Sequence, residues 1–312
     1  MVVRAFQSGD SVASLLELCS EVFPVERIDR EKWVRNVFLD ANFRSEGLGV
    51  VEAEGKTAGL VVAFAPQTLE GAGASKKRGY VTLLGVRRQW ENQGFGASLL
   101  AYAEDYLREC GCRECWVSPY SPGYFAPGVD VAAYGRGLQF LARKGYVEVS
   151  RPISMAVDLR ALTPPDWVVE RRSELAVQGV EVREYSEDWL APLIEFARRE
   201  FHEDWARFVR SAAEDILRGG RNDRLIFLEE RGEVRAFSHY NADRFGPIGV
   251  ASEERGRGLG HVLMFETLKA QKESGQSSAY FLWSDLRTAD RLYNAAGFKV
   301  VRTFATLRKE HV

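Results

Sequence analysis

The feature that most constrains this chain is an internal repeat, in which one order of strands and helices occurs twice. A short alternating strand at residues 2–6 opens the first copy, and one at 180–185 opens the second. Each is followed by a stretch with apolar residues at helical spacing, and then by two strands joined by a glycine turn, at 54–56 and 231–233. A repeat of this length predicts two copies of one folding unit.

In each copy a further strand runs into a glycine-rich loop and a second helix. The strand at 80–86 precedes Gly94-Phe95-Gly96, and the strand at 247–250 precedes the loop at 256–260. Another strand, a short helix ending in glycine plus an aromatic residue, and a closing strand complete both copies. Because this order is mixed rather than strictly alternating, we expect an α/β fold in which each copy is a twisted central mixed sheet with helices on both faces.

Length and one pair of prolines set the expected domain boundaries. The 312 residues exceed one ordinary hydrophobic core, and Pro164-Pro165 cannot continue the interior of a helix or a sheet. We therefore expect an N-terminal domain at 1–160, a linker at 161–178 and a C-terminal domain at 179–312.

Bulk properties exclude several classes of partner. Apolar residues make up 46% and charged residues 28%, as in ordinary globular proteins. The net charge of -2 gives no broad cationic field, so nucleic acid is not an expected partner. No apolar run approaches the roughly 20 residues of a membrane-spanning helix, and Met1 does not open a secretory signal. We expect a cytoplasmic protein without a membrane partner, and the sequence gives no oligomeric state.

Three of the four cysteines lie close together, at Cys110, Cys112 and Cys115. A metal or redox site is one interpretation of this cluster, and ordinary thiols at a helix end are the other. Zinc sites need a fourth ligand, and no second Cys/His group exists elsewhere in the sequence. We expect no metal.

The glycine loops are candidate anion sites. A helix that opens directly after a strand presents N–H groups without carbonyl partners, and its dipole adds positive charge there. In the second loop Arg255 and Arg257 add further charge. Glycines before a helix also occur in tight turns without a ligand, so the loop alone leaves both interpretations open.

The motifs of the second copy resemble those of the GNAT acetyltransferase superfamily. The loop at 255–260, Arg-Gly-Arg-Gly-Leu-Gly, is similar to its Arg/Gln-x-x-Gly-x-Gly/Ala acyl-CoA loop. Residues 293–298, Tyr-Asn-Ala-Ala-Gly-Phe, resemble its closing Tyr-x-x-x-Gly-Phe signature. The resemblance extends over nearly the whole chain in two copies, as in tandem GNAT proteins.

The resemblance implies an N-acetyltransferase that uses acetyl-CoA as co-substrate. The acceptor would be a primary amine, on a small molecule or a peptide, that attacks the thioester directly in a ternary complex. The pantetheine arm would lie between splayed strands near 248–251 and 281–284, and backbone atoms of Val250 would polarise the thioester carbonyl. The implied coenzyme-binding residues are Ile248, Gly249, Val250, Ala251, Arg255, Gly256, Arg257, Gly258, Leu259 and Gly260.

The resemblance also implies a catalytic residue, Tyr293, whose hydroxyl would protonate the departing thiolate; a tyrosine packed in the core is the alternative. The first copy departs from the pattern at both points. It has Leu141 in place of the tyrosine and Glu91 in place of Arg255. A carboxylate facing a pyrophosphate is repulsive. We therefore expect a degenerate first domain and a catalytic second domain.

The remaining site residues are open. Candidates for the general base are Glu200, His202, Glu203, His239 and Asp285. Aromatic candidates for an acceptor site, most of them equally well explained by core packing, are Trp205, Phe208, Tyr240, Phe245 and Trp283. An insertion at 121–130 reads either as a lid or as a surface loop packed by its own aromatics.

Two other functions remain as alternatives. The pair of domains could be a non-catalytic acyl-CoA-binding or protein-interaction module, which Glu91 and Leu141 favour for the first copy. A nucleoside triphosphate site is disfavoured because no Gly-Lys-Ser/Thr follows either loop.

Overall fold

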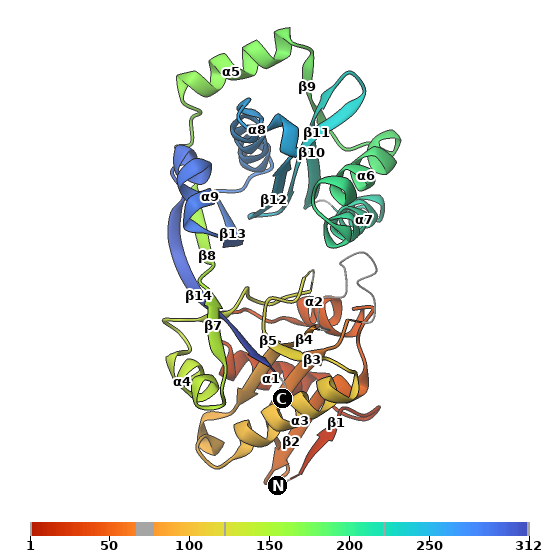
Figure 1. Ribbon diagram of the computed structural model, residues 1–312, viewed down its shortest axis with the longest axis vertical. Coiled ribbons are helices and arrows are strands. Elements are labelled where there is room, and N and C mark those ends of the chain that lie inside the picture. The colour runs from red at the N-terminus through yellow and green to blue at the C-terminus, as the bar shows by residue number, and fades with distance from the viewer. Residues whose placement is uncertain (1, 67–77, 122, 221, 311–312) are drawn as a thin grey trace. The chain divides into compact units, whose positions relative to one another are not determined.

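The computed structural model describes residues 2–66, 78–121, 123–220 and 222–310, and its contacts divide the chain into two compact units (Figure 1). Unit 1 consists of Met1–Pro152 and Thr303–Val312, and unit 2 of Ile153–Arg302. Each unit has a mixed sheet with helices on both faces, which confirms the predicted fold class.

Unit 1 follows the element order predicted for the first copy. Its helices are α1 (Val12–Val22), α2 (Arg30–Trp33), α3 (Phe95–Glu109) and α4 (Gly135–Arg143). Its strands are β1 (Val3–Ala5), β2 (Leu48–Ala53), β3 (Lys56–Phe64), β4 (Arg78–Val86), β5 (Glu114–Val117), β6 (Val129–Asp130), β7 (Val147–Ser150) and the last part of β14 (Lys299–Glu310).

Unit 2 repeats this order with one added helix. Its helices are α5 (Asp166–Val177), α6 (Leu190–Glu200), α7 (Glu203–Leu217), α8 (Leu259–Glu273) and α9 (Leu286–Arg291). Its strands are β8 (Ile153–Asp158), β9 (Val180–Glu184), β10 (Asp223–Glu230), β11 (Glu233–Asn241), β12 (Arg244–Val250) and β13 (Ser278–Ser284).

The two sheets share one topology. Unit 1 has the order β1-β2-β3-β4-β5-β14, and unit 2 the order β9-β10-β11-β12-β13-β8. Among the described strand pairs of each sheet only one is parallel, β4 with β5 in unit 1 and β12 with β13 in unit 2. The hairpin turns fall where predicted, with positive φ at Glu54 and Gly55 and again at Arg231 and Gly232. Such φ values favour glycine and give the turns the twist of the flanking strands.

The closing strands are exchanged between the two halves of the sequence. β8 ends the first repeat but pairs antiparallel with β13 of unit 2. β14 ends the second repeat, and its pairs with β5 lie in unit 1. The predicted boundaries differ from this division, because each expected domain holds a strand that the other unit uses. The expected linker at 161–178 also contains α5, whose Val168 and Leu175 are buried in the core of unit 2.

Both faces of each sheet carry a hydrophobic core. In unit 2 one core lies under α5, α8 and α9, and includes Leu263, Phe281 and Tyr293. The other lies under α6 and α7, on the opposite side of β10 and β11 (Figure 1). Among the described residues no helix is long and apolar enough to cross a membrane.

Candidate active site

The predicted loop of unit 2 leads from β12 into α8. After β12, residues Ser252–Glu254 form one 3-10 turn, and two glycines then reverse the chain. Gly256 has φ +91° and Gly258, the N-cap of α8, has φ +88°. Only glycine adopts this left-handed region without strain, which explains why the loop has two of them.

Several N–H groups of this loop have no backbone acceptor in the part of the chain that the structure describes. Arg257 N–H donates to the carbonyl of Glu254 at 3.4 Å, a long bond. No carbonyl among the described residues accepts from the N–H of Gly256, Gly258, Leu259 or Gly260. These groups form a cluster of unpaired donors at the positive end of α8, as an anion site requires.

The two arginines of the loop have different surroundings. Arg255 is exposed, and no described carboxylate pairs with it. The guanidinium of Arg257 instead donates to Glu254, to Glu230 at 3.0 Å and to Gln178 at 3.0 Å. Arg257 therefore joins the loop to β10 and to the end of α5, and the side chain that remains available to an anion is that of Arg255.

Helix α5 adds a third cation to the loop. A Cβ at Gly258 would lie 2.9 Å from Cγ and 3.3 Å from Nε of Arg171, so Arg171 occupies the space that a side chain would fill. Its side chain is 40% exposed and pairs with Glu174 at 2.8 Å. Nearby, the Trp167 ring meets the His261 ring edge-on at 4.9 Å. No sequence pattern points to Arg171, because the segment that carries it is predicted to be a linker.

β12 separates from β13 where the resemblance implies a splayed pair. The one partner pair of these parallel strands within the described chain is Arg244 with Tyr280. Ala251 donates its N–H to Arg235 on β11 at 2.9 Å. Because successive N–H groups point to opposite edges of a strand, that of Val250 points toward the open edge. The geometry thus leaves a backbone donor in the gap between β12 and β13.

Tyr293 lies in the 3-10 turn Tyr293–Ala296, with its ring against Phe281 at 4.3 Å. Its side chain is buried, and its hydroxyl has no hydrogen-bond partner among the described residues. Burial raises the pKa of this phenol above its usual value, and the charge of Asp285 adds to the rise. Tyr293 is therefore neutral, as an acid must be before it donates its proton.

The five candidate bases all hold structural bonds. Glu200 accepts from the backbone of Ser252 at 2.9 Å, which lowers its pKa. Hydrogen bonds from Arg198, the larger cause, and from Arg210 lower the pKa of Glu203. The pKa of Asp285, the N-cap of α9, is lowered by a hydrogen bond from the backbone N–H of Thr288.

The two histidines among these candidates are also engaged. His202 is exposed and caps α7 by accepting from Asp204 N–H at 3.2 Å. His239 is buried with Nε2 2.8 Å from Asp223 and Nδ1 3.2 Å from the carbonyl of Gly246. A ring with both nitrogens on acceptors offers no lone pair to an amine.

The aromatic candidates are divided between the cores and the surface. Tyr240 and Phe245 are buried in the core under α8. Trp205 stacks on Phe201 with ring centroids 4.2 Å apart, and Phe208 meets His239 edge-on. Trp283 is 44% exposed at the end of β13. Of the five, Trp283 is therefore the one placed to meet a ligand from solvent.

Unit 1 keeps the backbone of the site and changes its side chains. β4 pairs with β5 as far as Val81 and then continues to Val86 paired with β3 alone. Gly94 is the N-cap of α3 with φ +91°. Glu91 lies 3.3 Å from Arg136, and Leu141 is buried in the core. The predicted departures thus lie at the positions that correspond to the charged and catalytic groups of unit 2.

The insertion of unit 1 is packed into its core rather than standing over a cleft. Phe125 is 1% exposed, and Tyr120, just before the insertion, stacks on Phe64 at 4.6 Å. The Tyr120 hydroxyl donates to Asp40 at 2.7 Å. Of the residues predicted to form this loop, Pro122 lies outside the described residues.

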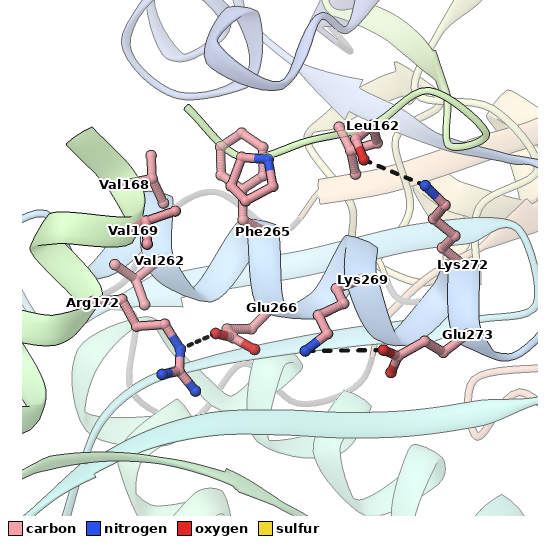
Figure 2. Close-up of a pocket in the computed structure, with 11 residues that line it drawn as sticks. Leu162, Val168, Val169, Arg172, Val262, Phe265, Glu266, Lys269, Lys272 and Glu273 are labelled. Carbon is pink, nitrogen blue, oxygen red and sulfur yellow. Dashed lines mark hydrogen bonds and ion pairs between the residues drawn. The ribbon is translucent and has the colours of Figure 1, made fainter. Parts of the chain in front are cut away.

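A groove of about 450 Å³ runs between α5 and α8 (Figure 2). In it Arg172 reaches Glu266, and Lys272 donates to the carbonyl of Leu162 at 3.4 Å. Its lining includes none of the predicted coenzyme residues and not Tyr293. The groove therefore lies apart from the candidate active site, although both involve α8.

The cysteine cluster belongs to unit 1. Cys112 and Cys115 are buried beside α3, and Cys110 is exposed. All of them are free thiols, and no group of three or more potential metal ligands gathers within the described ranges.

Comparisons with known proteins show which known folds this architecture resembles. Residues 12–123 match the model of the acetyltransferase (GNAT) family. A GCN5-related N-acetyltransferase from Sphaerobacter thermophilus superposes with a TM-score of 0.70 at 17% identity, over 99% of this chain and 95% of that one. A tandem GNAT protein from the clavulanic acid biosynthesis pathway gives 0.64 at 16%, over 99% and 97%. The chain is a tandem protein of the GNAT fold. No curated protein matches it.

One structure similar to this chain is much longer than it. The chain covers 38% of a fungal multi-domain GH3 beta-N-acetylglucosaminidase that has a GCN5-related glucosamine N-acetyltransferase region. There the TM-score is 0.82 at 20% identity, over 99% of this chain. At such identities the likeness of the three structures concerns the fold. The family match falls in unit 1, the copy expected to be degenerate, and it ends before Leu141.

Proposed function

We propose that this tandem GNAT protein is an N-acetyltransferase, with acetyl-CoA as co-substrate, a primary amine as acceptor and unit 2 as the catalytic unit. The observation that carries the proposal is the unpaired donor cluster at Gly256, Gly258, Leu259 and Gly260 beside an exposed Arg255. An anion with several oxygens, such as a pyrophosphate, matches donors of this kind. The gap between β12 and β13 opens toward the end of β12 that leads into this loop.

The proposed reaction assigns a separate task to each group. The amine nitrogen bonds the acetyl carbon, the carbon–sulfur bond breaks, the amine loses a proton and the thiolate gains one. The N–H of Val250 stabilises the negative charge that develops on the acetyl oxygen, since a fixed donor there needs no reorganisation. Tyr293 donates the proton to sulfur. Because the five candidate bases are held in other bonds, we assign the amine's proton to water.

Unit 1 supports a different proposal, that it is a folded partner without catalysis. Glu91 brings a negative charge to the position of Arg255, and Leu141 cannot donate a proton. An acyl-CoA-binding or protein-interaction role for the whole chain is the competing function. It predicts coenzyme binding, or none, without release of thiol in the presence of an amine.

Calorimetric titration with acetyl-CoA tests both proposals on the whole protein. We expect one site per chain, lost in Arg255→Glu and kept in Glu91→Arg, since these positions correspond in the two loops. Thiol release is then measured with a panel of amines that includes glucosamine, the acceptor in the description of the fungal region. Two equal sites would contradict the assignment of unit 1. No binding, or binding without thiol release from any amine, would favour the competing function.

A further inference from the structure

The gap between β12 and β13 begins at a bulge in β12. On one side of the bulge Ser238 of β11 pairs with Ile248, and on the other Tyr240 pairs with Phe245. Gly246 and Pro247 thus oppose a single residue of β11, His239. A bulge bends the strand that carries the extra residue. It lies just after Arg244, where β12 makes its one described pair with β13.

His239 is bonded to this bulge through one ring nitrogen and to a carboxylate through the other. Nδ1 is 3.2 Å from the carbonyl oxygen of Gly246, and Nε2 is 2.8 Å from Oδ1 of Asp223. Asn241 donates to the second oxygen of that carboxylate at 2.6 Å. The side chains of His239 and Asp223 are 6% and 10% exposed, so water competes little for these bonds.

Both partners of the ring are acceptors. A neutral imidazole donates from one nitrogen only, whereas an imidazolium donates from both. In the neutral form one ring lone pair would face a carbonyl or carboxylate oxygen inside the protein, which is unfavourable. The two contacts together therefore fit a charged ring that balances Asp223.

The other elements around the ring add little charge. From β10, Arg224 directs its guanidinium to the carbonyl oxygen of Asp223 at 2.7 Å. From α7 the ring meets Phe208, which is uncharged, at 4.8 Å. The charged side chains of α7 pair along the helix or with its neighbour: Glu203 with Arg198 and Arg210, Asp204 with Arg207, and Glu214 with Arg218.

We infer that His239 is a positioning residue for the proposed reaction: held by Asp223, its imidazolium fixes the carbonyl of Gly246 and so maintains the bulge that parts β12 from β13. The inference rests on the proposed function, since that gap is where the thioester arm would lie. On deprotonation the carboxylate keeps the Nε2 proton, and the bond to Gly246 is lost. The segment from Ile248 to Val250 then loses one anchor of its position.

The first test needs no coenzyme. Nitrogen-15 NMR of the imidazole rings reports which of the four histidines are charged at a given pH. We expect the backbone amide signals of Gly246 and Ile248 to move together with the protonation of the His239 ring. In Asp223→Asn this coupling should disappear. Amide signals that do not respond to the protonation of His239 would overturn the inference.

The second test links the bulge to the coenzyme. We expect the acetyl-CoA affinity of the native protein to fall as pH rises through the His239 titration, by at least threefold. In His239→Gln, which donates without titrating, this fall should vanish, and in His202→Gln it should persist. An unchanged pH dependence in a folded His239→Gln protein would refute the link. Absence of acetyl-CoA binding at every pH would refute the proposed function, while the NMR result still decides the role of His239 in the bulge.

Discussion

At the scale of the residue, Tyr293 combines a buried ring with a hydroxyl that no described group binds. If it protonates the thiolate, Tyr293→Phe should lower kcat on the order of 10²-fold, as for loss of a general acid, and leave the KM for acetyl-CoA nearly unchanged. The usual pKa of a tyrosine phenol is about 10, and burial raises that of Tyr293. The phenol therefore stays protonated beyond about pH 10. The rate should show no loss from its ionisation below that pH. Steady-state kinetics from pH 7 to 10 measure both effects.

Tyr240 provides the matched control, since it is a buried tyrosine of the same core. Tyr240→Phe should leave kcat within a factor of two of the native value. Equal losses in the two variants would indicate that Tyr293 acts through packing alone.

Residue roles were the part of the site least open to prediction from the sequence. The loop at 255–260 and Tyr293 could be found because they form local patterns. The bond between Arg257 and Glu230 could not be predicted, because the two residues are 27 positions apart and meet only when β10 and the loop lie side by side. The same holds for Arg171 beside Gly258, and for His239 and Asp223, which adjacent strands bring together.

At the scale of the element, the position of β12 depends on the joint between α6 and α7. Phe201, in that joint, lies on Gly249, where a Cβ would come within 2.3 Å of its ring. Gly249→Ala should therefore displace the ring and destabilise the protein by about 1–3 kcal/mol, as overpacking does. It should also weaken acetyl-CoA binding, because β12 carries Val250. Urea unfolding and calorimetry give the two values.

Gly135→Ala is the control for this change, since a Cβ there meets nothing within 4 Å and the position has no left-handed φ. Its free energy of unfolding should stay within about 0.5 kcal/mol of the native value, as for most surface substitutions. If Gly249→Ala is equally harmless, Phe201 does not fix β12.

Most elements followed from local sequence patterns. Alternation and glycine turns predicted both hairpins, and helical spacing predicted α1 and α6. The helix α5 differs from the predicted linker at 161–178, because the proline pair does not interrupt a helix but precedes one: the helix begins directly after Pro165. Proline at the boundary of a helix is common, since the first turn needs no N–H bond at that position.

At the scale of the whole molecule, the exchanged strands decide which pieces of the chain can fold. A fragment of residues 1–160 lacks the part of β14 that belongs to unit 1, and with it the buried Phe304 and Leu307. Each such side chain contributes about 2–5 kcal/mol. We expect this fragment to be unfolded or aggregated by circular dichroism and size-exclusion chromatography.

A rearranged fragment tests whether the missing strand is the cause. Residues 1–152, joined to 303–310 by a short glycine–serine linker, restore the strand, because Phe304 N–H donates to Pro152 at 2.9 Å and the two ends are adjacent. It should unfold cooperatively in urea. Folding of the 1–160 fragment to the same stability would show that β14 is dispensable to unit 1. No local pattern predicts the exchange, because β8 and β14 have similar sequence positions in the two repeats.

The placement of Thr303–Glu310 also sets the order of events during synthesis. β5 is complete after residue 117, yet its partner strand is translated nearly 190 residues later. At about 5–20 residues per second, the ribosome leaves that edge of the sheet uncovered for roughly 10–40 seconds. An unpaired edge invites pairing with other chains. Nascent forms of this protein should therefore depend on chaperones until Thr303–Glu310 leave the exit tunnel.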